Sequence, residues 1–204
     1  MMRLLLRRAV MGGVAFVAAL GVSATSASAT GSGVWTVSPG GNYTGTGTNP
    51  LFTWGSTTFN CGSSSVSGYL SPTDADGLAA GTFLPAYASC NIAGIPFTYS
   101  SGPTPWKINF LQRNAANPSR VDLSITGVTL NWSATGCHVS WSGTLYGQYD
   151  NATGQLSTGL NGAPAGQVVA GAGASCLGLV VTGDVLTIKA TYTLTPKQTI
   201  TPPA

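Results

Sequence analysis

Acidic residues are scarce in this chain: it contains no glutamate, and only 6% of its 204 residues are charged, against about 25% in an ordinary globular domain. A helical domain would use the Glu, Lys and Ala that favour helices, so the composition argues against one. Serine, threonine, asparagine and glycine must supply the solubility instead. Such a composition is common in exported β-proteins.

Clusters of positive charge are also missing. Three of the eight Lys and Arg residues lie in the first eight residues of the chain. The other five are balanced by the five aspartates, so the net charge of the chain after residue 8 is about zero. These five cations are scattered along the chain. A phosphate-binding surface needs clustered Lys and Arg, so the sequence predicts no nucleic-acid partner.

Long hydrophobic runs are confined to the N-terminus. Arginines and an apolar run at residues 9–22 precede the small-residue site Ala27-Ser28-Ala29, an order typical of a secretory signal peptide. We expect residues 1–29 to be removed and residues 30–204 to form one extracellular domain without a membrane span. An uncleaved anchor is the alternative, although the run is short for one, and the arginine pair leaves the general secretory and twin-arginine routes both open.

Cysteines in metal-binding pairs are absent as well. None of Cys61, Cys90, Cys137 and Cys176 belongs to a C-x-x-C motif, so we expect neither a metal site nor a cofactor. An even number of cysteines in an exported chain predicts two disulfides. Three pairings are open. Sequential pairing, Cys61–Cys90 with Cys137–Cys176, is preferred because it needs no interleaving of the two halves, and each bridge would contribute about 3–4 kcal/mol.

Alternation of apolar and polar residues is what the chain does have. Val121, Leu123 and Ile125 alternate with polar residues, which is the period of a half-buried strand. At Gly127 the phase slips by one residue before the apolar face continues from Val128, a pattern that predicts a β-bulge. With a second alternating run that follows a turn, residues 120–149 predict a long hairpin.

Shorter alternating runs, separated by glycine and proline turns, occupy most of the remaining sequence. We count ten or more strands and no convincing helix. The predicted fold is therefore all-β, an antiparallel β-sandwich or barrel with two disulfides. Residues 30–50 are expected to form a loose arm around one short strand, and residues 196–204 a C-terminal tail.

A fixed order of motifs runs from Phe59 to Thr201. It reads Phe-Asn-Cys, Pro-Trp-Lys-Ile-Asn, Gly-Cys, Cys-Leu-Gly-Leu-Val and Ala-Thr-Tyr-Thr-Leu-Thr-Pro-Lys-Gln-Thr-Ile-Thr. This layout resembles a group of small secreted actinobacterial proteins without an assigned function. The resemblance implies export and a shared β framework, and it transfers no functional residue.

Catalytic candidates are few. His138 is the single histidine, and its place after Cys137 on an alternating strand predicts that it faces solvent. A Ser-His-Asp triad would need His138, but no Gly-x-Ser-x-Gly elbow is present. A glycosidase would need two facing carboxylates, for which Asp122 and Asp150 are candidates only if folding brings them together.

Two further motifs could bind ligands. Asp74-x-Asp76-Gly77 is similar to the start of a calcium loop but lacks a third acidic ligand and the closing glutamate, so we interpret it as a polar turn. Three of the five tryptophans are in phase with core residues. Trp35 and Trp54 lie in glycine-rich surroundings and are the candidates for a binding role at the surface.

Two classes of function remain open. The leading hypothesis is a secreted, non-enzymatic binding or structural module, of which a carbohydrate-binding module with a cell-surface or glycan ligand is a specific form. The alternative is a secreted hydrolase that uses His138 with an aspartate. The first predicts exposed aromatic residues on a flat face or groove; the second predicts His138 within hydrogen-bond reach of an Asp and a Ser in a pocket.

Overall fold

The structure is a computed structural model that describes residues 33–92, 94–159 and 168–204. Residues 1–29, the predicted signal peptide, lie outside this described part. The described residues contain no helix, and the pairings between their strands are antiparallel, which confirms the all-β prediction. None of them forms an apolar helix long enough to cross a bilayer.

Strands of 2 to 15 residues make up most of the described chain. In chain order they are β1 (Trp35–Ser38), β2 (Gly41–Thr48), β3 (Leu51–Trp54), β4 (Thr57–Leu70), β5 (Thr73–Asp74), β6 (Gly81–Ile92), β7 (Ile95–Pro96), β8 (Thr98–Ser100), β9 (Trp106–Arg113), β10 (Arg120–Ala134), β11 (Cys137–Asp150), β12 (Gln155–Thr158), β13 (Val168–Ala170), β14 (Ser175–Cys176), β15 (Val180–Val181), β16 (Val185–Thr195) and β17 (Thr199–Thr201).

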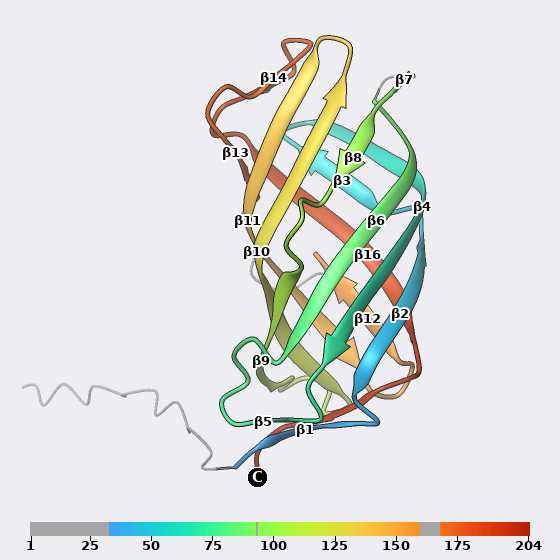
Figure 1. Ribbon diagram of the computed structural model, residues 1–204, viewed down its shortest axis with the longest axis vertical. Helices are drawn as coiled ribbons and strands as arrows, with labels where there is room; N and C mark the ends of the chain where they lie inside the picture. The colour runs from blue at the N-terminus through green and yellow to red at the C-terminus, as the bar shows by residue number, and fades with distance from the viewer. Residues whose placement is uncertain (1–32, 93, 160–167) are drawn as a thin grey trace, which may run out of the picture. The chain divides into compact units, whose positions relative to one another are not determined.

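The main sheet closes on itself. β10 pairs with β11 on one side and with β9 on the other, and the path β10–β11–β12–β16–β2–β4–β6–β9 returns to β10, as Figure 1 shows. At three places on this ring a second, shorter strand continues the wall: β13 beyond β12, β3 beyond β2, and β8 beyond β9. The fold is therefore a closed antiparallel barrel rather than a sandwich.

The long β10–β11 hairpin has the predicted form. Its register shifts between Ile125 and Val128, where Gly127 adopts a φ of 70°. This bulge restores the phase, so that both halves of β10 direct their apolar side chains inward. The prediction of a bulge at Gly127 is confirmed.

Aromatic side chains fill much of the barrel. The Trp132 ring lies 5.1 Å from Phe59 and 5.0 Å from Trp141, and Phe83 stacks on Trp106 at 5.7 Å. An interior bounded by eight strands is just wide enough to be filled by side chains. The barrel interior is thus a hydrophobic core, and the outward side chains form the surface.

Both disulfides join directly paired residues of neighbouring strands. Cys61 pairs with Cys90 between β4 and β6, and Cys137 with Cys176 between β11 and β14, at Cα–Cα distances of 4.0 and 3.8 Å. The predicted sequential pairing is confirmed. Each bridge therefore links strands that are already adjacent.

The expected loose arm at residues 30–50 is wrong for its described part. β2 is a full member of the wall, paired with β4 along its whole length and with β16 through its central residues 44–46. The alternation of apolar and polar residues is hard to recognise in β2, because glycines occupy most of its inward positions. A Cβ on Gly45 would lie 2.8 Å from both Leu194 Cδ2 and Val66 Cγ1, so the packing leaves no room for the apolar residue that would have revealed the strand.

The expected C-terminal tail is also wrong. β17 pairs with β1, which pairs with β5, and this small sheet crosses the lower end of the barrel in Figure 1. Gln198 and Ile200 are buried. The Tyr149 hydroxyl donates to Gln198 O at 2.8 Å and accepts from Gln198 N at 2.9 Å. These contacts fix residues 198–201 against the barrel, although the prolines and threonines of this segment had suggested an unpaired tail.

Candidate functional site

Two rows of hydroxyl groups lie on the outer wall of the barrel, across β16, β2 and β4. The side chains are exposed because they alternate with inward core residues along each strand. The strand register places them side by side. The first row is Thr195, Thr44 and Ser67, and the second is Thr193, Thr46 and Ser65; we call these six residues the hydroxyl face.

Regular strand geometry sets the spacing of this array. Neighbouring strands lie about 4.8 Å apart, and residues i and i+2 of one strand about 6.7 Å apart. Small β-branched or hydroxylated side chains such as Thr46 and Ser65 have few rotatable bonds, so holding them in place costs little conformational entropy. The hydroxyl face is consequently a preorganised set of groups that both donate and accept hydrogen bonds.

A hollow of about 400 Å³ adjoins this face on β2, β4 and β6. Its lining carries no charged residue. Ser101, from the segment that follows β8, also lines it. The lining residues are Thr44, Gly45, Thr46, Ser65, Val66, Ser67, Leu84, Pro85, Ala86 and Ser101.

The next outward residue of β4 beyond the hollow is an exposed tyrosine. Tyr69 is two residues beyond Ser67 on β4, on the same outward side, and its side chain is 44% exposed. Its backbone N–H donates to Thr82 Oγ1 at 3.0 Å. In register, Asn42, Tyr69 and Thr82 form the next row of outward side chains. An exposed aromatic residue therefore occupies the row next to Ser67, which lines the uncharged hollow.

Sequence reasoning missed this site. Tyr69 was available as a signal, since Val66 and Leu70 are buried and a strand with period 2 would place residue 69 in the opposite phase from Leu70. The hydroxyl rows had no comparable signal, because they are assembled from strands that are far apart in sequence.

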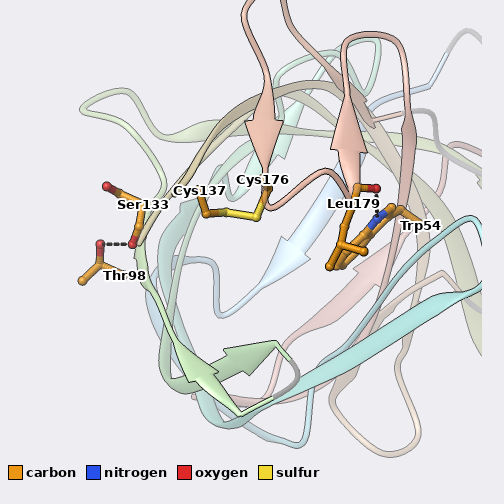
Figure 2. Close-up of a disulfide and its surroundings, with 6 residues drawn as sticks. All are labelled: Trp54, Thr98, Ser133, Cys137, Cys176 and Leu179. Carbon is orange, nitrogen blue, oxygen red and sulfur yellow. Dashed lines mark hydrogen bonds between the residues drawn. A yellow bond between two sulfur atoms is a disulfide. The ribbon is translucent and has the colours of Figure 1, made fainter. Parts of the chain in front are cut away.

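The two sequence-predicted binding tryptophans are buried, so the expectation that they lie at the surface is wrong. Trp35 is 5% exposed and packs 5.3 Å from the Phe110 ring; Trp54 is 3% exposed. Trp54 Nε1 donates to Leu179 O at 3.2 Å, as Figure 2 shows. The glycines near these tryptophans occupy turns and closely packed positions, which made core strands resemble surface loops.

His138 is exposed, as predicted, on the outer side of β11. Its register neighbours are Ser133 on β10 and Ser175 on β14. A catalytic triad also needs a carboxylate that orients the imidazole, and neither neighbouring position supplies one. The described residues contain no group of three or more His, Cys, Asp or Glu side chains that could hold a metal ion.

Asp122 and Asp150 lie on the same outer side of the β10–β11 hairpin, since Asp150 pairs with Arg120 and Asp122 with Gln148. Protein groups already bind both carboxylates. Asp122 accepts hydrogen bonds from Gln112, Asn114 and Gln148, and Asp150 accepts from Arg120 Nε at 3.0 Å and from the Ala152 amide at 2.9 Å.

These contacts affect the acidity of Asp150. Partial burial raises the pKa of its carboxyl, but the hydrogen bonds from Arg120 and from backbone amides outweigh this and hold the pKa below its ordinary value. The general acid of a glycosidase needs a raised pKa. The arrangement therefore suits a structural ion pair better than it suits an acid catalyst.

The Asp74-x-Asp76-Gly77 segment forms the expected polar turn. Asp74 Oδ1 accepts from the Gly77 amide at 2.6 Å, and Asp76 Oδ1 accepts from the Leu78 amide at 2.9 Å. These are Asx-type contacts between a side chain and the backbone two or three residues later. One oxygen of each carboxylate is therefore committed to the loop backbone.

Comparison of the chain with protein-family models, with curated proteins and with solved structures found no match.

Proposed function

We propose that this protein is a secreted, non-enzymatic binding module that holds a saccharide against the hydroxyl face. The observation that carries the proposal is the uncharged hollow of about 400 Å³ with hydroxyl-bearing walls, together with the exposed Tyr69 two residues beyond Ser67 on β4. Serine and threonine hydroxyls can match the mixed donor and acceptor pattern of sugar hydroxyls. The Tyr69 ring offers an apolar surface with a polar tip, which suits the apolar side of a sugar ring.

The composition of the hollow argues against a protein partner. Protein interfaces are enriched in Tyr, Trp, Phe, Met and Arg, and depleted in Ser and Ala. Here Ser, Thr, Gly and Ala dominate, and Leu84 is the largest side chain of the lining. Few positions could serve as anchors for a protein, whereas many could exchange hydrogen bonds with a polyhydroxyl ligand.

The place of action follows from the cysteines. Two closed disulfides indicate an extracellular or otherwise oxidising environment. We propose that the chain reaches it by secretion, with cleavage after Ala29. N-terminal sequencing of exported protein should then begin at Thr30; an N-terminus at Met1 would contradict this.

Binding of the mature protein to a panel of polysaccharides tests the proposed function. Tyr69→Ala should weaken binding about 3- to 10-fold, the equivalent of about 0.5–1.5 kcal/mol for one aromatic contact. Ser65→Glu, which places a bulky charge inside the hollow, should weaken it further.

Tyr146→Ala is the matched control, because Tyr146 is an outward tyrosine of β11, on the opposite side of the strand ring from β4. This variant should bind as the unaltered protein does. Circular dichroism must show that all variants keep the native fold. If no polysaccharide binds, or if Tyr69→Ala and Ser65→Glu bind normally, the proposed function is wrong.

A further inference from the structure

A lysine belongs to the row of outward side chains that contains Tyr69. Asn42, Tyr69 and Thr82 continue in register to Lys107 on β9, because Thr82 pairs with Lys107. Lys107 is exposed and alternates with the buried Trp106 and Ile108, so its side chain faces the same outer wall. The site therefore has an aromatic ring and a cation in one row.

The charge of Lys107 is available to a ligand. In the described part of the chain, no carboxylate oxygen lies within 4.0 Å of its amino group, and the ion pair that this part forms joins Arg120 and Asp150. Its register neighbours, Thr82 and Thr126, are uncharged. Because the Lys107 ammonium group has no carboxylate partner, an anionic ligand can pair with it without first breaking an existing ion pair.

The charged residues of the neighbouring strands lie at the far end of β9, where Arg113 and Gln112 pair with the β10 residues Val121 and Asp122. β2, β4 and β6 have no charged residue, and β9 has only Lys107 and Arg113, at opposite ends. Tyr69 and Lys107 are two strand spacings apart, which is about 9–10 Å between their backbones. The flexible lysine side chain shortens this gap, so a single sugar unit can contact the tyrosine ring and bring a substituent to the amino group.

We infer that the saccharide is acidic: a uronic-acid unit lies on Tyr69, and its carboxylate pairs with Lys107. This inference rests on the proposed function and specifies its ligand class. A single ammonium group, with no arginine beside it in the row, matches a singly charged carboxylate. A phosphate would call for the bidentate contacts or the several cations that such groups usually receive.

Binding of polygalacturonate and of its methyl ester, compared at low and high salt, tests the assignment. The two polymers share a backbone and differ in the carboxylate charge. We expect the acid form to bind at least about 5-fold more tightly at low salt, and the difference to shrink as salt screens the exposed pair. Lys107→Gln should lower the affinity for the acid form to that for the ester and so remove the preference.

Lys189→Gln serves as the control, since Lys189 is exposed on β16 but lies outside the hydroxyl face. It should keep the preference for the acid form. Equal binding of acid and ester by the unaltered protein, or a preference that survives Lys107→Gln, would overturn the inference. Stronger Lys107-dependent binding of a sulfated polysaccharide than of polygalacturonate would also overturn it, because the anion would then be a sulfate.

These outcomes separate the two proposals. If neutral polysaccharides bind and Tyr69→Ala weakens them while Lys107→Gln has no effect, the binding module stands and the acidic ligand is wrong. If no polysaccharide, charged or neutral, binds the protein, both proposals fail.

Discussion

At the scale of single residues, Trp132 has the most central place in the core. Its side chain is fully buried, and its ring lies within 6.0 Å of the rings of Phe52, Phe59, Trp54 and Trp141. It projects from β10 just beyond the bulge at Gly127, so the bulge determines that this indole enters the barrel. Trp132 therefore joins β10 to the aromatic residues of β3, β4 and β11.

Replacing Trp132 should therefore be costly. Trp132→Ala should lower the free energy of unfolding by about 3–5 kcal/mol, because it opens a large cavity among rings that cannot collapse into it. Trp132→Phe should cost less, and it provides a measurable variant if the alanine protein does not fold. Urea denaturation measures both.

Leu111→Ala is the comparison for this prediction. Leu111 is 48% exposed on β9, so its loss should change stability by no more than about 0.5 kcal/mol. A loss below about 1 kcal/mol for Trp132→Ala would show that the aromatic core is less tightly packed than the structure indicates.

At the scale of elements, the C-terminal strand β17 links the end of the chain to the hairpin turn after β11. Asn151 Nδ2 donates to Ile200 O at 2.9 Å, and Ile200 N donates to Asn151 Oδ1 at 2.8 Å. Together with the two contacts between Tyr149 and Gln198, these bonds form a reciprocal set between side chains of one element and the backbone of another. These four hydrogen bonds add to the backbone pairing of the short strand β17 with β1.

Deleting residues 198–204 should destabilise the protein by about 3–6 kcal/mol. The deletion removes the buried Ile200 side chain and leaves the buried Tyr149 hydroxyl without its partners. Thermal unfolding compared with a deletion of residues 202–204 alone measures the effect. If both deletions unfold at the same temperature, β17 contributes nothing to the barrel.

At the scale of the whole molecule, the barrel encloses several tyrosines whose ionisation is disfavoured. Desolvation by burial is the main cause that raises the pKa of each. The Tyr192 hydroxyl also lies 3.3 Å from that of Tyr87, and the proximity of Tyr192 raises the pKa of Tyr43, Tyr87 and Tyr99 further. The affected residues are Tyr43, Tyr87, Tyr99, Tyr149 and Tyr192.

Stability should consequently fall at alkaline pH. An unfolded tyrosine loses its proton near pH 10, whereas these folded ones stay protonated to higher pH. Their contribution is complete below pH 10 and is lost as the pH rises above it, by about 1.4 kcal/mol per pH unit for each tyrosine that ionises only on unfolding.

Tyrosinate absorbance followed together with circular dichroism measures this effect. The absorbance of the five tyrosines should rise only as the fold is lost. Full ionisation of all tyrosines while the native spectrum persists would contradict the burial of these side chains.

The local sequence pattern determined the parts of the fold that depend on neighbouring residues. Alternation predicted the strands, the phase slip at Gly127 predicted the bulge, and the order of four cysteines predicted both bridges. The outward position of His138 followed from the same alternation. Each of these conclusions needs only a few consecutive residues, or their order along the chain.

Only the tertiary structure decided what depends on contacts between distant segments. Closure of the sheet, the pairing of β2 with β16 that forms the hydroxyl face, and the anchoring of Gln198 against Tyr149 join residues that are far apart in sequence. The burial of Trp54 and the place of Gly45 in a strand of the wall also depend on such contacts, so the sequence pattern did not indicate them. Whether a small or an aromatic residue lies inside or outside a barrel depends on how much space its distant neighbours leave, and that space exists only once the sheet has closed.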